Sequence, residues 1–154
     1  MTAIRLTAIA HGSDAYREAV NLRYEVLRKP LGMDFTPQQL QSERDALHYA
    51  AYVGEKLVAT AYLLPLGNGR AHLKQMAVAP DVRAAGVGRA LLAYLEDDAR
   101  QRGYREIVAD ARVSALDFYL KQGYLASGDV YDHVGLPHRH IGKLLIDPKV
   151  ESGQ

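Results

Sequence analysis

Arg83-Ala84-Ala85-Gly86-Val87-Gly88-Arg89 joins a strand pattern to a helix pattern through two closely spaced glycines, and this junction decides the fold. The mostly apolar segment 72–78 before it predicts a strand that stops at Pro80, because proline cannot continue a β-ladder. After it, apolar residues recur at spacings of three and four, which predicts a helix that ends at Gly103. The glycines let a ligand approach amides that open a helix, whose dipole favours negative charge. The segment therefore predicts a phosphate-binding turn.

The motif distinguishes between several kinds of phosphate site. It lacks the Gly-Lys-Ser/Thr ending of an NTPase loop, and Leu91 stands where a dinucleotide-binding turn requires a small residue. What remains is Arg-x-x-Gly-x-Gly, formed by Arg83, Gly86 and Gly88. This pattern resembles the acetyl-CoA loop of the GNAT superfamily of N-acetyltransferases. A structural crossover that binds no ligand is the alternative that an isolated Gly-x-Gly leaves open.

The composition fits one compact domain. The chain has 154 residues, of which 48% are hydrophobic and 24% are charged, so it is long enough to bury a core. A formal net charge of +1 gives no reason to expect nucleic acid or a membrane surface as a partner. The chain has no cysteine, which excludes disulfides, thiolate nucleophiles and Cys-ligated zinc. We see neither a signal-peptide pattern nor a membrane-length apolar run, and we expect a cytoplasmic protein.

Turn signals and apolar runs predict a single α+β domain over residues 1–147, followed by a polar tail over 148–154. Strands are expected at 4–9, 49–53, 57–64, 70–78, 107–109, 124–131 and 139–146. Helices are expected after an N-cap at Ser13, at 38–42, from the glycine turn to Gly103, and between Ser114 and Gly123. Ser114 and Asp117 match a capping box at the start of this last helix.

The resemblance to GNAT enzymes extends beyond the glycine turn. The run Ala115-x-x-Phe118-Tyr119-x-x-x-Gly123-Tyr124 is similar to the family's short helix with its aromatic-Tyr pair. The run 135–138, the pair Leu22-Arg23 and the acidic stretch before His48 look like the ElaA-like branch. The resemblance implies a mixed, mostly antiparallel sheet of about seven strands, with a splayed central parallel pair and helices on both faces. Arg112 departs from the asparagine of many relatives, which leaves one cofactor contact open.

The same resemblance implies an acetyl-CoA-dependent N-acetyltransferase that acts on a primary amine. Without a cysteine for an acyl-enzyme, we expect direct attack within a ternary complex, and we expect no metal. The turn would bind the pyrophosphate and the preceding strand end would bind the pantetheine. The implied cofactor-binding residues are Met76, Ala77, Val78, Arg83, Ala84, Ala85, Gly86, Val87, Gly88, Arg89 and Tyr119. A non-catalytic CoA sensor or partner-binding module is the alternative, and the retained Phe-Tyr pair favours the enzyme.

Two residues are the catalytic candidates. Tyr119 would protonate the leaving thiolate, since a phenol with an ordinary pKa near 10 is protonated at neutral pH. Its other interpretation is a core aromatic. His138 would accept the proton of the amine, because a histidine titrates near neutrality. His138 and His140 point to one face of a strand and, with His133, resemble a metal site, although two structural histidines are the interpretation we prefer.

The acceptor contacts are predicted from the variable parts of the chain. Arg23, Tyr24 and Arg28 on the first helix and Asp110 at a strand end are candidates to bind the amine. Asp110 and Glu25 are also alternative bases. The segments 33–46 and 132–137 would add to specificity. Small-molecule and protein amines both fit, and the ten tyrosines suit a homodimer interface without specifying one.

Overall fold

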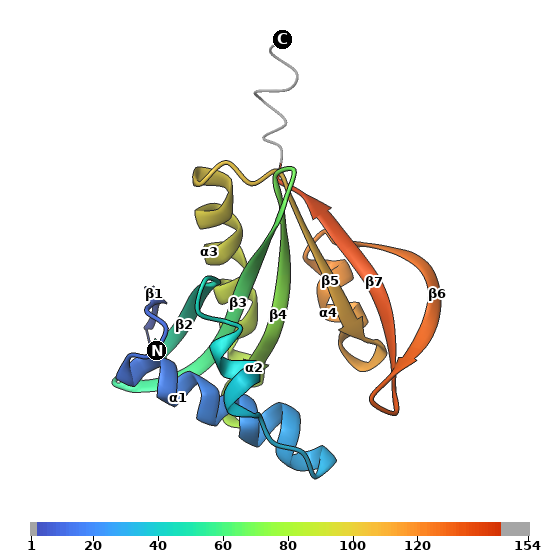
Figure 1. Cartoon of the computed structure of the whole chain (residues 1–154). Coiled ribbons are helices and arrows are strands. Elements are labelled where there is room, and N and C mark those ends of the chain that lie inside the picture. The colour runs from blue at the N-terminus through green and yellow to red at the C-terminus, as the bar shows by residue number, and fades with distance from the viewer. Residues whose placement is uncertain (1–2, 146–154) are drawn as a thin grey trace. The chain divides into compact units, whose positions relative to one another are not determined.

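The structure, a computed structural model, describes residues 3–145 (Figure 1). Its strands are hydrogen-bonded in the order β1-β2-β3-β4-β5-β7-β6. The strands are β1 (Ile4–Ile9), β2 (Leu47–Val53), β3 (Lys56–Gly67), β4 (Arg70–Val78), β5 (Glu106–Arg112), β6 (Leu125–His133) and β7 (Leu136–Leu144). The helices are α1 (Asp14–Arg23), α2 (Pro37–Gln41), α3 (Val87–Gln101) and α4 (Leu116–Lys121). The mostly antiparallel seven-stranded sheet with one parallel pair is therefore confirmed, while the splay of that pair stays a prediction.

The chain divides into two compact units. Unit 1 comprises residues 1–64 and 73–95, and unit 2 comprises residues 65–72 and 96–154. The single domain over 1–147 stays a prediction, and the expected tail at 148–154 lies outside the described residues.

The core of unit 1 lies around the antiparallel pair β2 and β3. Five consecutive residues of β2 and seven of β3 are buried, which requires cover on both faces because successive side chains point in opposite directions. On one face, Ala19 of α1 packs with Ala50 and Tyr52 of β2. On the other face, the ring of Tyr49 meets the ring of Tyr94 from α3 at 6.1 Å.

The first helix begins where the sequence predicts it. Ser13 Oγ accepts a hydrogen bond from the amide of Tyr16 at 3.1 Å and donates one to the carbonyl of Ala10 at 2.6 Å. The helix continues beyond α1 as a π-helical turn over Tyr24–Arg28 and a 3-10 turn over Lys29–Leu31. Gly32 then ends it in the left-handed conformation, with φ of 68°.

Unit 2 contains the antiparallel strands β5, β7 and β6, which lie side by side in Figure 1. Side chains alternate along β5: Ile107, Ala109 and Ala111 are buried, while Glu106 and Asp110 belong to the opposite face. The β6–β7 connection is shorter than expected, because His133 already pairs with Leu136 and only residues 134–135 form the turn. The segment 132–137 is therefore mostly strand and not a loop.

The expected capping box at Ser114 does not form. Residues Val113–Ala115 form a 3-10 turn, and α4 begins after Ala115 without a side-chain cap. The capping box requires the helix to begin directly after Ser114, and the 3-10 turn moves that start to Leu116. The pattern was correct for a helix in this region but wrong for its first residue.

Alanine substitutions at Ser13 and Ser114 test which of these two serines caps a helix. Ser13→Ala removes an N-cap and should lower the free energy of unfolding by about 1 kcal/mol. Ser114→Ala should change it by less than about 0.5 kcal/mol, as for ordinary surface sites. Urea denaturation of both variants measures the difference, and equal losses would show that the cap assignment is wrong.

Candidate active site

The end of β4 in unit 1 has an irregular backbone. Gln75 has a positive φ of 56°, which is uncommon for a residue with a side chain. Such residues cost about 1–3 kcal/mol and often mark functional sites. Gln75 directly precedes Met76, Ala77 and Val78, of which Ala77 is buried and the other two are half-buried. The positive φ therefore lies directly before the strand end where the sequence predicts cofactor contacts.

The glycine turn is more ordered than an open loop. Residues Pro80–Ala85 form a 3-10 turn, and Arg83 Nε donates to the carbonyl of Val78 at 3.2 Å, which ties the turn to the end of β4. Gly86 then adopts φ of 78°, a conformation that favours glycine, and no heavy atom lies within 4 Å of the position where a Cβ would stand. The space beside Gly86 is open.

Helix α3 starts directly after Gly86. The amide of Ala90 donates to the carbonyl of Gly86 at 3.0 Å, which is the first intrahelical bond. The amides of Val87, Gly88 and Arg89 precede this bond and therefore have no intrahelical acceptor. Together with the helix dipole, they form a site that suits a phosphate group.

Tyr119 lies in α4 of unit 2 and is 8% exposed. Its ring makes edge contacts with Phe118 at 5.1 Å and with Tyr124 at 5.7 Å. Burial raises the pKa of Tyr119 to about 12, so the expectation of an ordinary pKa near 10 is wrong. The phenol remains protonated at neutral pH, and it holds its proton more tightly than an exposed tyrosine does.

A buried network holds the neighbour of Tyr119 in place. Tyr124 Oη donates to Glu96 Oε2 at 2.9 Å, and Lys143 Nζ donates to Glu96 Oε1 at 2.9 Å. The amide of Tyr124 also donates to the carbonyl of Tyr119 at 3.1 Å. These contacts fix the end of α4 and, through it, the position of the Tyr119 ring.

His138 lies in β7 of unit 2 and is 7% exposed. Its Nδ1 is 2.9 Å from the carbonyl oxygen of Leu136. A carbonyl only accepts hydrogen bonds, so Nδ1 carries the proton and Nε2 has the lone pair. The ring stacks on Tyr131 at 6.0 Å and meets His133 edge-on at 5.3 Å.

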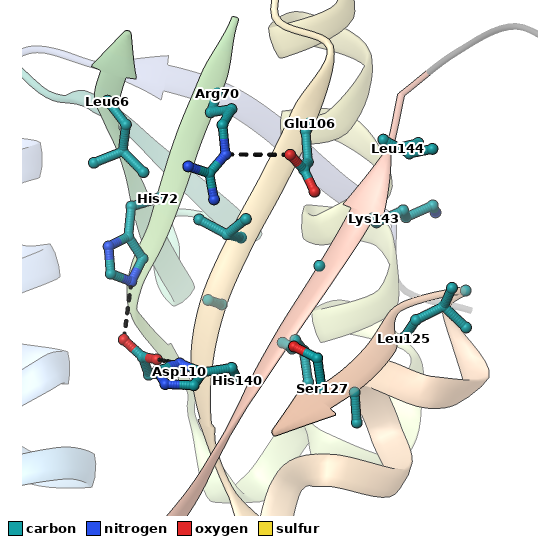
Figure 2. Close-up of a pocket in the computed structure, with 16 residues that line it drawn as sticks. Leu66, Arg70, His72, Glu106, Asp110, Leu125, Ser127, His140, Lys143 and Leu144 are labelled. Carbon is teal, nitrogen blue, oxygen red and sulfur yellow. Dashed lines mark hydrogen bonds and ion pairs between the residues drawn. The ribbon is translucent and has the colours of Figure 1, made fainter. Parts of the chain in front are cut away.

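An open hollow of about 1010 Å³ lies on unit 2, and Asp110 is in its wall. Figure 2 shows Asp110 between His72 and His140, and Arg70 beside Glu106. Asp110 Oδ2 is 3.3 Å from His72 Nε2, and Oδ1 is hydrogen-bonded to His140 Nδ1. Arg70 Nε and Glu106 Oε1 are 3.2 Å apart.

The pKa of Asp110 lies below its usual value. Burial alone would raise this pKa, but hydrogen bonds from Tyr131 and His140, together with the charges of His72 and His140, lower it more. The carboxylate is therefore ionised at neutral pH. Burial, together with the hydrogen bond to Asp110 and the charge of Asp110, raises the pKa of Tyr131 to about 12. Tyr131 therefore remains a hydrogen-bond donor.

The acceptor candidates on the first helix lie in different surroundings. Arg23 is 1% exposed, and its guanidinium forms two hydrogen bonds with Glu43, at 2.7 and 2.6 Å. Tyr24 and Arg28 are half-buried, and the Arg28 guanidinium lies 4.8 Å from the centre of the Phe35 ring. Glu25 is exposed and pairs with Lys29 at 3.3 Å. Arg23 thus sits in the interior of unit 1.

The structure describes no metal centre and no membrane helix in residues 3–145. No group of three or more His, Asp or Glu side chains in this range could hold a metal ion. None of the helices in the same range combines the length and the apolar character that a membrane span needs.

Sequence reasoning missed three residues of these sites. Glu43 is the partner of Arg23, but the two are 20 positions apart and no local pattern joins them. His72 approaches Asp110 from a different strand, 38 positions earlier in the chain. Gln75 belongs to an otherwise regular strand pattern, and a positive φ leaves no signal in the side-chain sequence.

Comparison with known proteins identifies the class of this site. The sequence model of the Acetyltransferase (GNAT) family matches residues 14–124. The chain is 29% identical to a Bacillus subtilis protein, described as the uncharacterized N-acetyltransferase YjcF, over 136 residues that cover 88% of this chain and 96% of the relative. The chain therefore belongs to the acetyltransferase (GNAT) family, whose members use acetyl-CoA.

Two solved structures share the fold. Escherichia coli ElaA superimposes with a TM-score of 0.78 and 19% identity, covering 92% of this chain and 99% of ElaA. An aminoglycoside 6'-N-acetyltransferase, solved with coenzyme A, gives a TM-score of 0.78 and 15% identity, covering 93% of this chain and 98% of that protein. At these identities the likeness concerns the fold alone, so the ElaA-like branch stays a prediction.

Proposed function

We propose that this protein transfers an acetyl group from acetyl-CoA to a primary amine, by direct attack of the amine within a ternary complex. The observation that carries this proposal is the turn from Arg83 to Gly86, which leads directly into the N-terminus of α3 and has open space beside Gly86, in a chain of the acetyltransferase family. The sequence supports direct attack, because it has no cysteine that could carry an acyl group and no evident Ser-His-Asp ordering.

The residues of the turn fit the pyrophosphate of acetyl-CoA. The amides of Val87, Gly88 and Arg89 would donate to its oxygens, and the exposed side chains of Arg83 and Arg89 would add positive charge. Ala84 and Ala85 belong to the 3-10 turn Pro80–Ala85, in which amides form hydrogen bonds to carbonyls three residues earlier. We therefore assign Ala84 and Ala85 the role of shaping the turn.

The irregular end of β4 fits the pantetheine arm. The backbone of Met76, Ala77 and Val78 would pair with the amide groups of the arm. The positive φ of Gln75 would turn the neighbouring amide toward the thioester oxygen. A preorganised donor to an oxygen that gains negative charge is worth about 3 kcal/mol. Tyr119 would donate its phenolic proton to the leaving sulfur.

The acceptor is proposed to be a primary amine of a small molecule or a protein. Tyr24, Arg28 and Asp110 stay predictions for its recognition. Arg23 would act indirectly, since its ion pair with Glu43 fixes the segment between α2 and β2. For the proton acceptor, His138 stays a prediction, and its Nε2 lone pair is compatible with that role.

Blocking the glycine turn tests the cofactor assignment. A Gly86→Trp variant should raise the Kd of acetyl-CoA in isothermal titration by about 100-fold or more, because it removes at least two charge-assisted hydrogen bonds of about 1.5 kcal/mol each. Gly12→Trp is the matched control: Gly12 has φ of 81°, also lies in unit 1, and also has no heavy atom within 4 Å of its Cβ position. Equal binding by the wild type and both variants would disprove the assignment.

A further inference from the structure

The hollow of unit 2 holds a row of three interacting side chains from three strands. Asp110 of β5 lies directly opposite His140 of β7 in the strand register, so the two side chains share one face of the sheet. Asp110 uses one carboxylate oxygen for His140 and the other for His72 of β4 (Figure 2). The arrangement fixes Asp110 from two sides.

The hydrogen bond between Asp110 and His140 decides which ring nitrogen is basic. An ionised carboxylate only accepts, so His140 Nδ1 carries the proton and Nε2 retains its lone pair. Tyr131 of β6 stacks on the His140 ring with centroids 4.8 Å apart and an angle of 29°. Stacking on Tyr131 therefore fixes the orientation of the His140 ring, and the hydrogen bond to Asp110 fixes its tautomer.

His140 and His138 differ in their exposure to solvent. The side chain of His140 is 60% exposed and lines the hollow, whereas His138 is 7% exposed as a residue and is not among the lining residues. The Nδ1 of His138 faces a carbonyl of its own strand and has no carboxylate partner there. A base that takes a proton from a substrate bound in the hollow must line that hollow, and of these two histidines His140 does so.

We propose that His140 is the general base of the reaction and that Asp110 is its positioning residue. This inference rests on the proposed acetyl transfer. As the amine nitrogen forms its bond to the thioester carbonyl carbon, Nε2 of His140 takes a proton from that nitrogen. The C–S bond breaks, and the sulfur leaves with a proton from Tyr119. Water then exchanges protons with His140 and Tyr119, so the products are an N-acetyl amine and free CoA thiol.

Few other charged groups face His140. His72 and Asp110 approach from β4 and β5, and Tyr131 approaches from β6. Further along the hollow, Arg70 and Glu106 pair with each other, and Lys143 is bound to Glu96. A change in the kcat–pH profile of a His140 variant is therefore attributed to the row formed by His72, Asp110 and His140.

The kinetic test uses one amine acceptor throughout, so that its own ionisation contributes equally to every profile. His140→Gln should lower kcat about 100-fold, as expected for a lost general base, and should remove the ascending part of the kcat–pH profile. Asp110→Asn should lower kcat while the Kd of acetyl-CoA stays unchanged. His11→Gln, at a half-buried histidine of unit 1, is the control and should behave as the wild type.

The outcomes of this test separate two failures. An active wild type whose ascending limb survives in His140→Gln overturns this inference alone, and loss of the limb in His138→Gln instead would assign the role to His138. A wild type that binds acetyl-CoA without acetylating any amine overturns the proposed function as well.

A second measurement does not depend on activity. Imidazole ¹H–¹⁵N spectra at a pH where the histidines are neutral should show His140 protonated on Nδ1, and Asp110→Asn should change that signal. Protonation on Nε2 in the wild type would overturn the inference, because the base would then lack its lone pair on the open side.

Discussion

Replacing Tyr119 by phenylalanine should lower kcat by about 100-fold or more, the usual contribution of a positioned proton donor. Phenylalanine keeps the ring that packs against Phe118 and Tyr124, so the loss should arise from the missing hydroxyl and not from misfolding. The raised pKa of about 12 means that donation occurs as the sulfur gains charge and not before, since the phenol is a weaker acid than an ordinary tyrosine. Steady-state turnover by thiol release measures the effect.

A matched aromatic variant controls for packing. Tyr104→Phe removes a hydroxyl from a half-buried tyrosine of the same unit and should leave kcat within about twofold. If Tyr119→Phe also retained wild-type turnover, Tyr119 would be a core aromatic and another group would protonate the thiolate.

Glu43→Gln should lower the free energy of unfolding by roughly 3–5 kcal/mol, the range for breaking a buried ion pair. Gln has nearly the shape of Glu, so the loss reflects the Arg23 charge that remains without its partner. That charge is 1% exposed, and Arg23 Nε is already buried without a hydrogen-bond partner among the described residues. Tyr16 Oη would also lose the charged acceptor to which it donates at 2.8 Å. Urea denaturation at pH 7 measures the change.

Removing the whole polar cluster is the control for this prediction. The triple variant Tyr16→Phe, Arg23→Met and Glu43→Leu leaves no charge unpaired and should recover most of the lost stability, because well-packed apolar residues can replace a buried pair. A loss below about 1 kcal/mol in Glu43→Gln would mean that the pair behaves as a surface salt bridge, contrary to its burial.

Local signals predicted the framework of the fold. The expected strands 4–9 and 70–78 match β1 and β4 residue for residue, and the first helix begins after Ser13 as expected. Alternation, apolar spacing and end signals depend only on neighbouring residues, so they can be read from the sequence. The glycine turn could be predicted for the same reason, because its motif consists of seven consecutive residues.

Features that depend on distant partners could not be predicted. Arg23 stays a predicted acceptor contact, and its contact with Glu43, which follows α2 in the chain, could not be predicted. His138 and His140 follow the same alternation, and only the packing of β5, β6 and β7 buries one and exposes the other. The pKa of Tyr119 depends on burial, which its local motif does not encode.

The central claim is that this chain catalyses amine-dependent acetyl transfer, and a two-substrate assay tests it most directly. Acetyl-CoA is incubated with a panel of amines, and free thiol and N-acetyl product are measured together. We predict equimolar thiol and product that both require an amine, with intersecting initial-rate lines for the two substrates, as expected for a ternary complex. Tight acetyl-CoA binding without amine-dependent thiol release would contradict the claim and identify a CoA-binding sensor instead.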